Sequence, residues 1–364
     1  MGLSAGIVGL PNSGKSTIFS AITATEIQRS SHMFSTTEPV KGVVTVPDDR
    51  LQKIADTIPT QKIVPAVMTV VDIPGLVSGS SSGEGMGVSF LGAIKESDAL
   101  LHVVRCFEKG DVQSVSGKID PAFDAEVVDM ELMACDVETL NRNCDRVIKK
   151  VRANDKDAIA AKAAFDKCLA HLQGGHVLRT LELTKTERDL LKPLFLLTIK
   201  PVLFVANVGD DDADGKSPNV AALRDYATRT SAQVVHLCGD IEAELARMSP
   251  DERAMFMAEL GFHESGLVRF IHAAFDLLGL QTYFTAGEKE TRAWVIHKGD
   301  TAPIGAGVIH TDFVKKFIRA EVYTFDDLMV HKTKDALRSA GKLRLEGKDY
   351  VLRDGDVCDF KIGN

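Results

Sequence analysis

The chain has 364 residues, more than one ordinary hydrophobic core accommodates, so its length predicts two or three domains. Apolar residues make up 45%, typical of a globular protein, and no run of about eighteen apolar residues predicts a membrane span. The net charge of -8 argues against a strongly basic nucleic-acid binder but leaves room for a local basic face. The N-terminus has no basic leader and the six cysteines form no CxxC pair. We therefore expect a cytoplasmic protein without a signal peptide, zinc site or disulfides.

Five short apolar runs predict the strands of one mostly parallel sheet, since helical stretches separate several of them. They are Ala5–Gly9, Val67–Val71, Leu100–Val104, Val202–Val205 and Val234–Leu237. This alternation is typical of the α/β class. It predicts a nucleotide-binding domain formed by residues 1–121 and 200–280.

Residues 122–199 interrupt that alternation. Between Ala122 and Lys192 there is no proline, and apolar residues recur at helical spacing. The pattern predicts two long antiparallel helices that turn near Asn154 and Asp155 and form an insertion between two strands of the sheet. A helical arm that contacts a partner and a segment that only packs on the sheet are both compatible with it.

From Gln281 onward the composition changes again. Glycine, threonine and short β-type runs return, with hairpin-turn signals at Gly347-Lys348 and Asp354-Gly355. Residues 281–364 are therefore predicted to form a small mixed α+β module, of a normal size for a compact domain.

The sequence Gly-Leu-Pro-Asn-Ser-Gly-Lys-Ser-Thr at residues 9–17 matches the phosphate-loop pattern G-x-x-x-x-G-K-[ST]. It lies between an apolar strand and a helical stretch, so backbone N–H groups and a helix N-terminus face the phosphates. Lys15 supplies positive charge to the β- and γ-phosphates, and the Ser16 hydroxyl ligates Mg²⁺. The predicted triphosphate-binding residues of this loop are Asn12, Ser13, Gly14, Lys15, Ser16 and Thr17.

A second motif, Val-Val-Asp-Ile-Pro-Gly at residues 70–75, places Asp72 at the end of an apolar strand. Asp72 there holds Mg²⁺, usually through a water, and the Gly75 N–H bonds the γ-phosphate and senses its loss. The serine- and glycine-rich segment that follows, residues 76–87, is interpreted as a switch rather than an unstructured surface loop. Either Thr36 or Thr37 completes the Mg²⁺ shell, and the pattern alone does not choose between them.

The strand ending in Asn207-Val208-Gly-Asp210 stands where GTPases carry Asn-Lys-x-Asp to read the base. Val208 replaces the lysine, which argues against guanine specificity, although Asp210 keeps an acid. Leu76 occupies the place of the glutamine that orients the attacking water in Ras-type enzymes, so we predict slow intrinsic hydrolysis with no identified catalytic group. His102 lies within an apolar strand and is interpreted as structural.

Together these motifs closely resemble the Obg-like ATPase family, also called YchF, a group of P-loop proteins of the translation-factor class. The resemblance runs nearly end to end and includes GIVGLPNSGKST, VDIPGLV…GEGMG, HVVRCFE, FVANVGD, LQTYFTAGEKETRAW and RLEGKDYVLRDGDV. It implies a Ras-like, Obg-type G domain with a coiled-coil insertion at residues 122–199. It also implies a C-terminal TGS domain, a ubiquitin-like β-grasp module, at residues 281–364.

The resemblance implies a preference for ATP over GTP. Asn207 and the Val208 backbone would bond the adenine edge, and Asp210 stands where the family has a glutamate, one methylene longer. Alignment with the family selects Thr36 as the Mg²⁺ threonine. Some bacterial members carry a histidine suggested to act in hydrolysis where this chain has Ser114, so that role does not transfer.

A K⁺ ion is a further expectation. Asn12 resembles the asparagine that holds K⁺ near the β- and γ-phosphates in related GTPases that have a hydrophobic residue at the position of Leu76. There K⁺ supplies part of the charge that an arginine finger supplies elsewhere.

The function predicted from these motifs is a regulatory, Mg²⁺-dependent ATPase that acts near the ribosome or its large subunit, as a monomer and without a membrane partner. The alternatives are a GTPase of the same switch class and a nucleic-acid-binding adaptor with vestigial hydrolysis. A metabolic kinase is disfavoured because no acceptor pocket is evident. RNA contact through the arm and the TGS domain is possible, although solvated surface charge is the simpler interpretation of the basic residues Arg146, Lys149, Lys150, Arg152, Lys315, Lys316, Arg319, Lys332, Lys334 and Arg338.

Overall fold

The computed structural model describes residues 4–27, 39–73, 88–108, 119–262 and 264–363. They divide into two compact units, one running to Val43 and then from Thr69 to Ala274, the other made of Val44–Met68 and the chain from Phe275. The second unit thus includes residues 44–68, which the sequence pattern grouped with the first domain. Strand pairing explains this, because β3 (Ile63–Val64) pairs with a strand of the C-terminal sheet.

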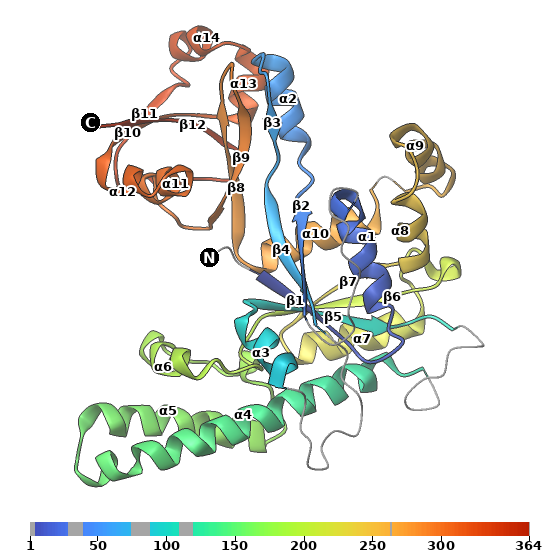
Figure 1. The fold of residues 1–364 in the computed structure, drawn as a ribbon, viewed down its shortest axis with the longest axis vertical. Coiled ribbons are helices and arrows are strands. Elements are labelled where there is room, and N and C mark those ends of the chain that lie inside the picture. The colour runs from blue at the N-terminus through green and yellow to red at the C-terminus, as the bar shows by residue number, and fades with distance from the viewer. Residues whose placement is uncertain (1–3, 28–38, 74–87, 109–118, 263, 364) are drawn as a thin grey trace. The chain divides into compact units, whose positions relative to one another are not determined.

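The first unit is built on a six-stranded sheet in the order β2–β4–β1–β5–β6–β7 (Figure 1). The pairs β1/β4, β1/β5, β5/β6 and β6/β7 are parallel. All five strands expected in this sheet are confirmed. The bounds are β1 Ser4–Val8, β2 Val40–Thr45, β4 Val67–Asp72, β5 Ala99–Arg105, β6 Val202–Asn207 and β7 Gln233–Leu237.

The strand β2 was not predicted from the sequence, because it is an edge strand and its first four residues alternate between partly buried and exposed. By contrast, every residue of β5 and β6 is buried. Helices cover both faces of the sheet, which is why these central strands are continuous apolar runs.

On one face of the sheet lies α1 (Lys15–Ile27), and on the other lie α3 (Val88–Glu96), α4 (Pro121–Arg152) and α7 (Pro218–Arg229) (Figure 1). The unit also contains α8 (Gly239–Leu245), α9 (Pro250–Glu259), α10 (Gly266–Leu277) and the short 3₁₀ helix η3 (Asp210–Asp212).

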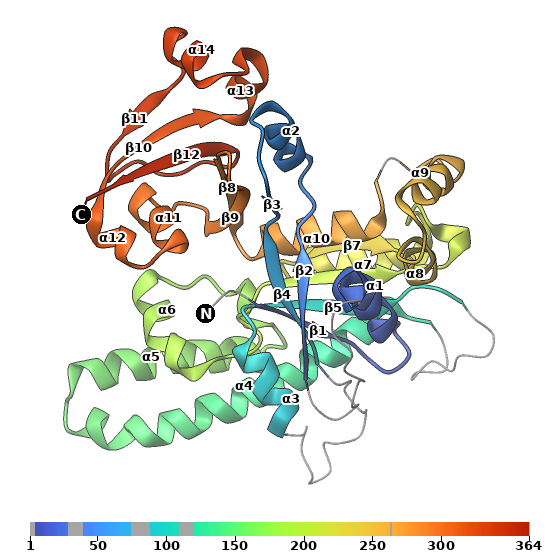
Figure 2. The ribbon, with the colours of Figure 1, turned by 45° about the horizontal axis from the view of Figure 1, so that its top comes forward.

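The predicted helical insertion is confirmed. α4 runs out along the arm and α5 (Lys156–Gln173) returns antiparallel to it (Figure 2). Asp120 and Asp155 cap the two helices, and Asn154 supplies the left-handed turn between them with φ +62°. The return path contains η1 (Leu178–Thr180), α6 (Lys185–Leu191) and η2 (Lys192–Leu194).

Two buried carboxylates on α4 fix the base of the arm: both bond the returning part of the insertion, and one also bonds α7. The Asp129 carboxylate accepts hydrogen bonds from Nη1 and Nη2 of Arg179 and, at 2.9 Å, from the hydroxyl of Tyr226 on α7. Two turns further along α4, Asp136 accepts hydrogen bonds from the backbone N–H groups of Leu197 (2.7 Å) and Thr198 (2.8 Å). The arm therefore has a fixed base.

The second unit contains a mixed sheet in the order β11–β10–β12–β8–β9–β3. The central pair β12/β8 is parallel, whereas β8/β9, β10/β12 and β10/β11 are antiparallel. This mixed sheet with short helices is the α+β module that the C-terminal sequence predicts. Its bounds are β8 Leu280–Ala286, β9 Thr291–His297, β10 Phe317–Thr324, β11 Arg344–Glu346, β12 Asp356–Ile362, α2 Asp49–Thr57, α11 Ala302–Ile309, α12 Asp312–Lys316, α13 Phe325–His331 and α14 Lys334–Ser339.

Arg50 shows how α2 joins this unit. Its guanidinium bonds the carboxylate of its own N-cap, Asp48, and that of Asp354, at 2.7 Å for the shortest contact. The two carboxylates stabilise the charged guanidinium and raise the pKa of Arg50. Among the described residues, no helix is long and apolar enough to cross a membrane.

Candidate nucleotide site

The phosphate loop lies between β1 and α1, in the strand–loop–helix context that the sequence predicts. Asn12 (φ +65°) and Gly14 (φ +89°) both have left-handed backbones. The Ser13 N–H bonds the Leu10 carbonyl at 3.3 Å, which closes the turn, and the Ile18 N–H bonds the Gly14 carbonyl as the helix begins. A turn of this kind leaves backbone N–H groups directed at an anion in front of the helix N-terminus.

Asn207 at the end of β6 holds this loop from behind. Its side-chain N–H donates to the Ser13 carbonyl at 2.9 Å, and its side-chain oxygen accepts the N–H of Gly239 at 3.0 Å. A Cβ atom on residue 14 would lie only 2.0 Å from Asn207 Nδ2. Gly14 is therefore required twice, for its positive φ and for the close approach of the asparagine.

Lys15 and Asp72 form an ion pair across the site. Their Nζ and Oδ1 atoms are 3.7 Å apart, and both side chains are largely buried. Burial raises the pKa of the Asp72 carboxyl, and the Lys15 ammonium partly offsets this effect. The structure thus brings together the lysine of the first motif and the aspartate of the second. Register explains it, because β1 and β4 are parallel neighbours with Ile7 opposite Asp72.

The oxygen donors at this site fit Mg²⁺. Asp72 Oδ1 is buried and makes no hydrogen bond within the described part of the chain. The hydroxyl-bearing Ser16 is exposed at the start of α1. One carboxylate and one hydroxyl, supplemented by phosphate oxygens and water, form the hard, oxygen-only environment that Mg²⁺ prefers.

The expected base-reading residues follow β6. Val208 is buried in the core, and its N–H donates to the Leu237 carbonyl at 3.0 Å, so the sheet already uses that donor. Asp210 is exposed at the start of η3, and its carboxylate accepts the N–H of Asp211 at 3.1 Å. Base recognition by Asn207, Val208 and Asp210 remains a prediction.

Two residues near this strand were not predicted from the sequence to belong to the site. Phe107 follows β5, and its Cβ lies 3.6 Å from the place that a Cβ on Gly209 would occupy. The Arg105 guanidinium lies 4.8 Å from the centre of the Phe107 ring. The motif HVVRCFE contains both residues. Only the parallel pairing of β5 with β6 brings the end of this motif beside the expected base-reading residues.

Several candidate residues lie outside the described residues: Thr36, Thr37, Gly75, Leu76 and Ser114. His102 is described and lies in the middle of the sheet. It is 2% exposed, and its ring centre lies 5.2 Å from that of Phe204. Burial lowers the pKa of His102 to about 4, so the imidazole is neutral at physiological pH.

Comparison with known proteins agrees with this arrangement. The family model described as "50S ribosome-binding GTPase" matches residues 4–158, and the model for the C-terminal domain of YchF GTPases, described as a protein of unknown function, matches residues 280–363. The chain is 47% identical over 360 residues to "Ribosome-binding ATPase YchF" of Escherichia coli O157:H7, covering 99% of each chain. It is 46% identical over 364 residues to the Bacillus subtilis protein of the same name, covering 100% of each.

A solved structure extends the likeness to the fold. The YchF GTPase of Schizosaccharomyces pombe matches with a TM-score of 0.87 at 32% identity, over 99% of this chain and 98% of that one. Sequence and fold agree along the whole length, from the phosphate loop through the helical arm to the C-terminal module. The chain belongs to the YchF family of P-loop nucleotide-binding proteins.

Proposed function

We propose that this chain is an ATP-hydrolysing switch protein that acts on the ribosome and prefers ATP to GTP. The observation that carries the proposal is the preformed phosphate site, in which Asn207 fixes the loop and Lys15 lies 3.7 Å from Asp72. The name of its relatives, "Ribosome-binding ATPase", suggests ATP as the nucleotide and the ribosome as the partner.

Phosphate binding follows from the loop. The backbone N–H groups between Asn12 and Lys15 surround the β-phosphate, and Lys15 turns from Asp72 to the β- and γ-phosphate oxygens. When bound, Mg²⁺ neutralises charge that develops on those oxygens, and Ser16, Thr36 and Asp72 would hold it, Asp72 through a water. The N–H groups of the loop are in place before the reaction and only the Lys15 side chain has to turn, so little reorganisation is needed.

The preference for ATP rests on Val208. A lysine at this position would contribute its aliphatic stem and its charge beside a guanine base, whereas the valine side chain is buried in the core. A GTPase of the same switch class is the second candidate. The observation that favours it is Asp210, exposed where an acid meets the guanine edge in GTPases.

Slow hydrolysis is part of the proposal, because Leu76 has no group that can orient water and Ser114 has no imidazole. A K⁺ ion beside Asn12 would then supply charge to the developing transition state. A ribosomal partner, or the Gly75 segment as it senses the γ-phosphate, would complete the site.

Calorimetry with ATP and with GTP, both with Mg²⁺, tests the nucleotide assignment on the wild type and on Lys15→Ala. Removing a charge that bonds phosphate costs about 2–5 kcal/mol, so ATP affinity should fall at least about 30-fold. Lys162→Ala, which breaks an exposed ion pair with Asp166 on the arm, is the matched control and should bind ATP normally. Tighter GTP than ATP binding would reject the ATP assignment.

Ribosome association and the K⁺ requirement need separate measurements. The protein should sediment with ribosomes, and the amount bound should differ between ATP and ADP. Phosphate release should be faster in K⁺ than in Na⁺, and Asn12→Ala should abolish the difference. Equal rates in the two salts, with and without ribosomes, would reject the K⁺ site and leave the ATPase assignment intact.

A further inference from the structure

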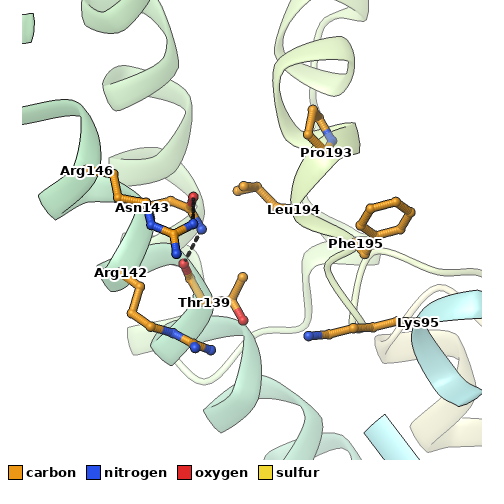
Figure 3. Close-up of a pocket in the computed structure, with 8 residues that line it drawn as sticks. All are labelled: Lys95, Thr139, Arg142, Asn143, Arg146, Pro193, Leu194 and Phe195. Atoms are coloured by element: carbon orange, nitrogen blue, oxygen red, sulfur yellow. Dashed lines mark hydrogen bonds between the residues drawn. The ribbon is translucent and has the colours of Figure 1, made fainter. Parts of the chain in front are cut away.

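A pocket of about 240 Å³ lies at the base of the helical arm, outside the nucleotide site. One wall is the face of α4 that carries Thr139, Arg142, Asn143 and Arg146, and the opposite wall is the turn Pro193–Phe195 (Figure 3). Lys95 at the end of α3 closes the floor between them. All of these residues belong to the first compact unit.

The pocket is cationic. Three of its lining residues are cations, Lys95, Arg142 and Arg146, and none of the lining residues is an acid. The ion-pair partner of Arg142 is Glu138 at 3.7 Å, and both side chains are more than half exposed, so the pair contributes little. Arg146 Nη1 approaches the Asn143 side-chain oxygen at 3.5 Å, a weak and exchangeable contact. Two arginines and a lysine thus converge on a space suited to an anion.

Phe195 gives the opposite wall an aromatic surface. Its side chain is 60% exposed and its φ is +49°, a left-handed conformation that is unfavourable for a bulky residue. Leu196, which follows it, is buried in the core of the arm, and Leu197 is buried in the core beside the sheet. A large aromatic ring held in solvent by a strained backbone is a feature that binding sites use.

The turn that carries Phe195 is fixed from below. The buried Asp136 accepts the N–H groups of Leu197 and Thr198 and, at 2.7 Å, the Thr198 hydroxyl. Asp136 lies on α4 one turn before Thr139 and two turns before Asn143, so it shares the helix face that forms the other wall. The aromatic wall and the cationic wall are therefore held in one geometry before any ligand arrives.

We propose that this pocket binds a nucleotide unit of unpaired RNA. The guanidinium groups of Arg142 and Arg146 and the Lys95 ammonium bind the phosphate, and an unstacked base packs on Phe195. Unpaired RNA is recognised by this combination of backbone charge and aromatic stacking, whereas duplex RNA keeps its bases stacked internally. An acidic peptide would use the cations but has no need of the exposed ring. The proposal rests on the ribosome association proposed above and names the part of this chain that contacts ribosomal RNA.

Fluorescence anisotropy with a labelled uridine oligoribonucleotide of about twelve residues tests the proposal. Arg142→Glu/Arg146→Glu should weaken binding by about tenfold or more at moderate salt. Phe195→Gly removes the ring but suits the left-handed backbone, so the turn should keep its fold, and affinity should fall by about fivefold. Phe195→Trp should retain binding because it retains a stacking surface.

Lys156→Glu/Lys185→Glu is the matched control. It makes the same change in net charge at two exposed arm residues, each in the first turn of a helix, where an acid is favourable. This variant should bind the oligonucleotide within about twofold of the wild type. If the control lost as much affinity for the oligonucleotide, the general charge of the arm would explain binding and the proposal would be overturned. An unchanged affinity of Phe195→Gly would also overturn it.

Two competitors and a measurement of ATP binding complete the test. The uridine oligoribonucleotide annealed to a complementary adenosine oligoribonucleotide should compete poorly. Polyglutamate that displaces the oligonucleotide from the wild type as well as free RNA does would assign the pocket to an acidic protein segment instead. ATP binding should stay unchanged in the pocket variants, while Lys15→Ala should lose ATP and keep RNA. A failure of ATP binding in the wild type would therefore count against the proposed function alone.

Discussion

Asn207 lies so close to Gly14 that no side chain fits at residue 14, because a Cβ atom there would lie 2.0 Å from Asn207 Nδ2. Ser13 of the phosphate loop and Asn207 at the end of β6 are 194 positions apart in sequence, yet the Asn207 side-chain N–H donates to the Ser13 carbonyl at 2.9 Å. The phosphate loop and the end of β6 are therefore packed together as one unit.

Gly14→Ala should lose both stability and nucleotide binding. The positive φ alone costs about 1–2 kcal/mol for alanine, and the clash with Asn207 adds to it. Gly279→Ala is the control, since Gly279 has φ +66° with no atom within 4 Å of the added Cβ. Urea denaturation should show a clearly larger loss in the free energy of unfolding for Gly14→Ala than for Gly279→Ala. Equal losses for the two variants would mean that the close approach carries no free energy.

Asn207→Ala should weaken ATP binding by about tenfold or more, because the Ser13 carbonyl and the Gly239 N–H lose their buried partner. The free energy of unfolding should fall by about 1–3 kcal/mol. Gln281→Ala removes another buried amide, which bonds the Leu352 carbonyl at 2.7 Å in the C-terminal unit. It should lower stability without changing ATP affinity in calorimetry. Normal ATP binding by Asn207→Ala would contradict the prediction.

The buried pair of Arg179 and Asp129 should be sensitive to loss of either partner. Both side chains are at most 4% exposed, so Arg179→Met removes the positive charge beside a buried carboxylate that keeps its Tyr226 hydrogen bond, and should cost about 3–5 kcal/mol. Asp129→Leu/Arg179→Met should cost less than the single change, because no unpaired charge remains. The exposed pair of Lys162 and Asp166 is the comparison.

Asp166→Asn should change the free energy of unfolding by less than about 1 kcal/mol, since exposed ion pairs contribute little. Chemical denaturation of all four proteins at one salt concentration gives the ranking. A double variant less stable than Arg179→Met would show that the pair does more than neutralise buried charge.

The lowered pKa of His102 predicts that the protein loses stability in mild acid. Its pKa is lowered by burial from 6.5 to about 4, so the unfolded chain binds a proton that the folded chain refuses between these values. Stability should therefore fall by roughly 3 kcal/mol as the pH drops from about 6.5 to about 4. His102→Phe should remove this slope in denaturation curves recorded across that range.

Asp124 acts in the opposite direction and must be considered in the same experiment. Burial raises its pKa to about 6, so folding favours its protonated form and its contribution to stability grows as the pH falls from about 6 to about 4. Asp124 is present in both proteins, so the difference between wild type and His102→Phe isolates the histidine. Parallel curves for the two proteins would show that His102 does not titrate differently on folding.

The sequence by itself determined the strands of the first sheet, the helical arm and the phosphate loop, because each is a local pattern. Continuous apolar runs predict strands buried on both faces, helical spacing without proline predicts the arm, and the loop pattern requires its neighbours in order. The edge strand β2 was missed because its alternating exposure gives no such run.

Tertiary structure decided what depends on residues distant in sequence. The pairing of β3 with β9 moved residues 44–68 into the C-terminal unit. The pairing of β5 with β6 brought Phe107 beside Gly209, and the folding back of the arm brought Phe195 opposite Arg142 and Arg146. A local pattern reports which side chains share a strand or a helix face. Which faces meet is decided by the burial of apolar surface over the whole chain, and this is why only the folded structure reveals the pocket.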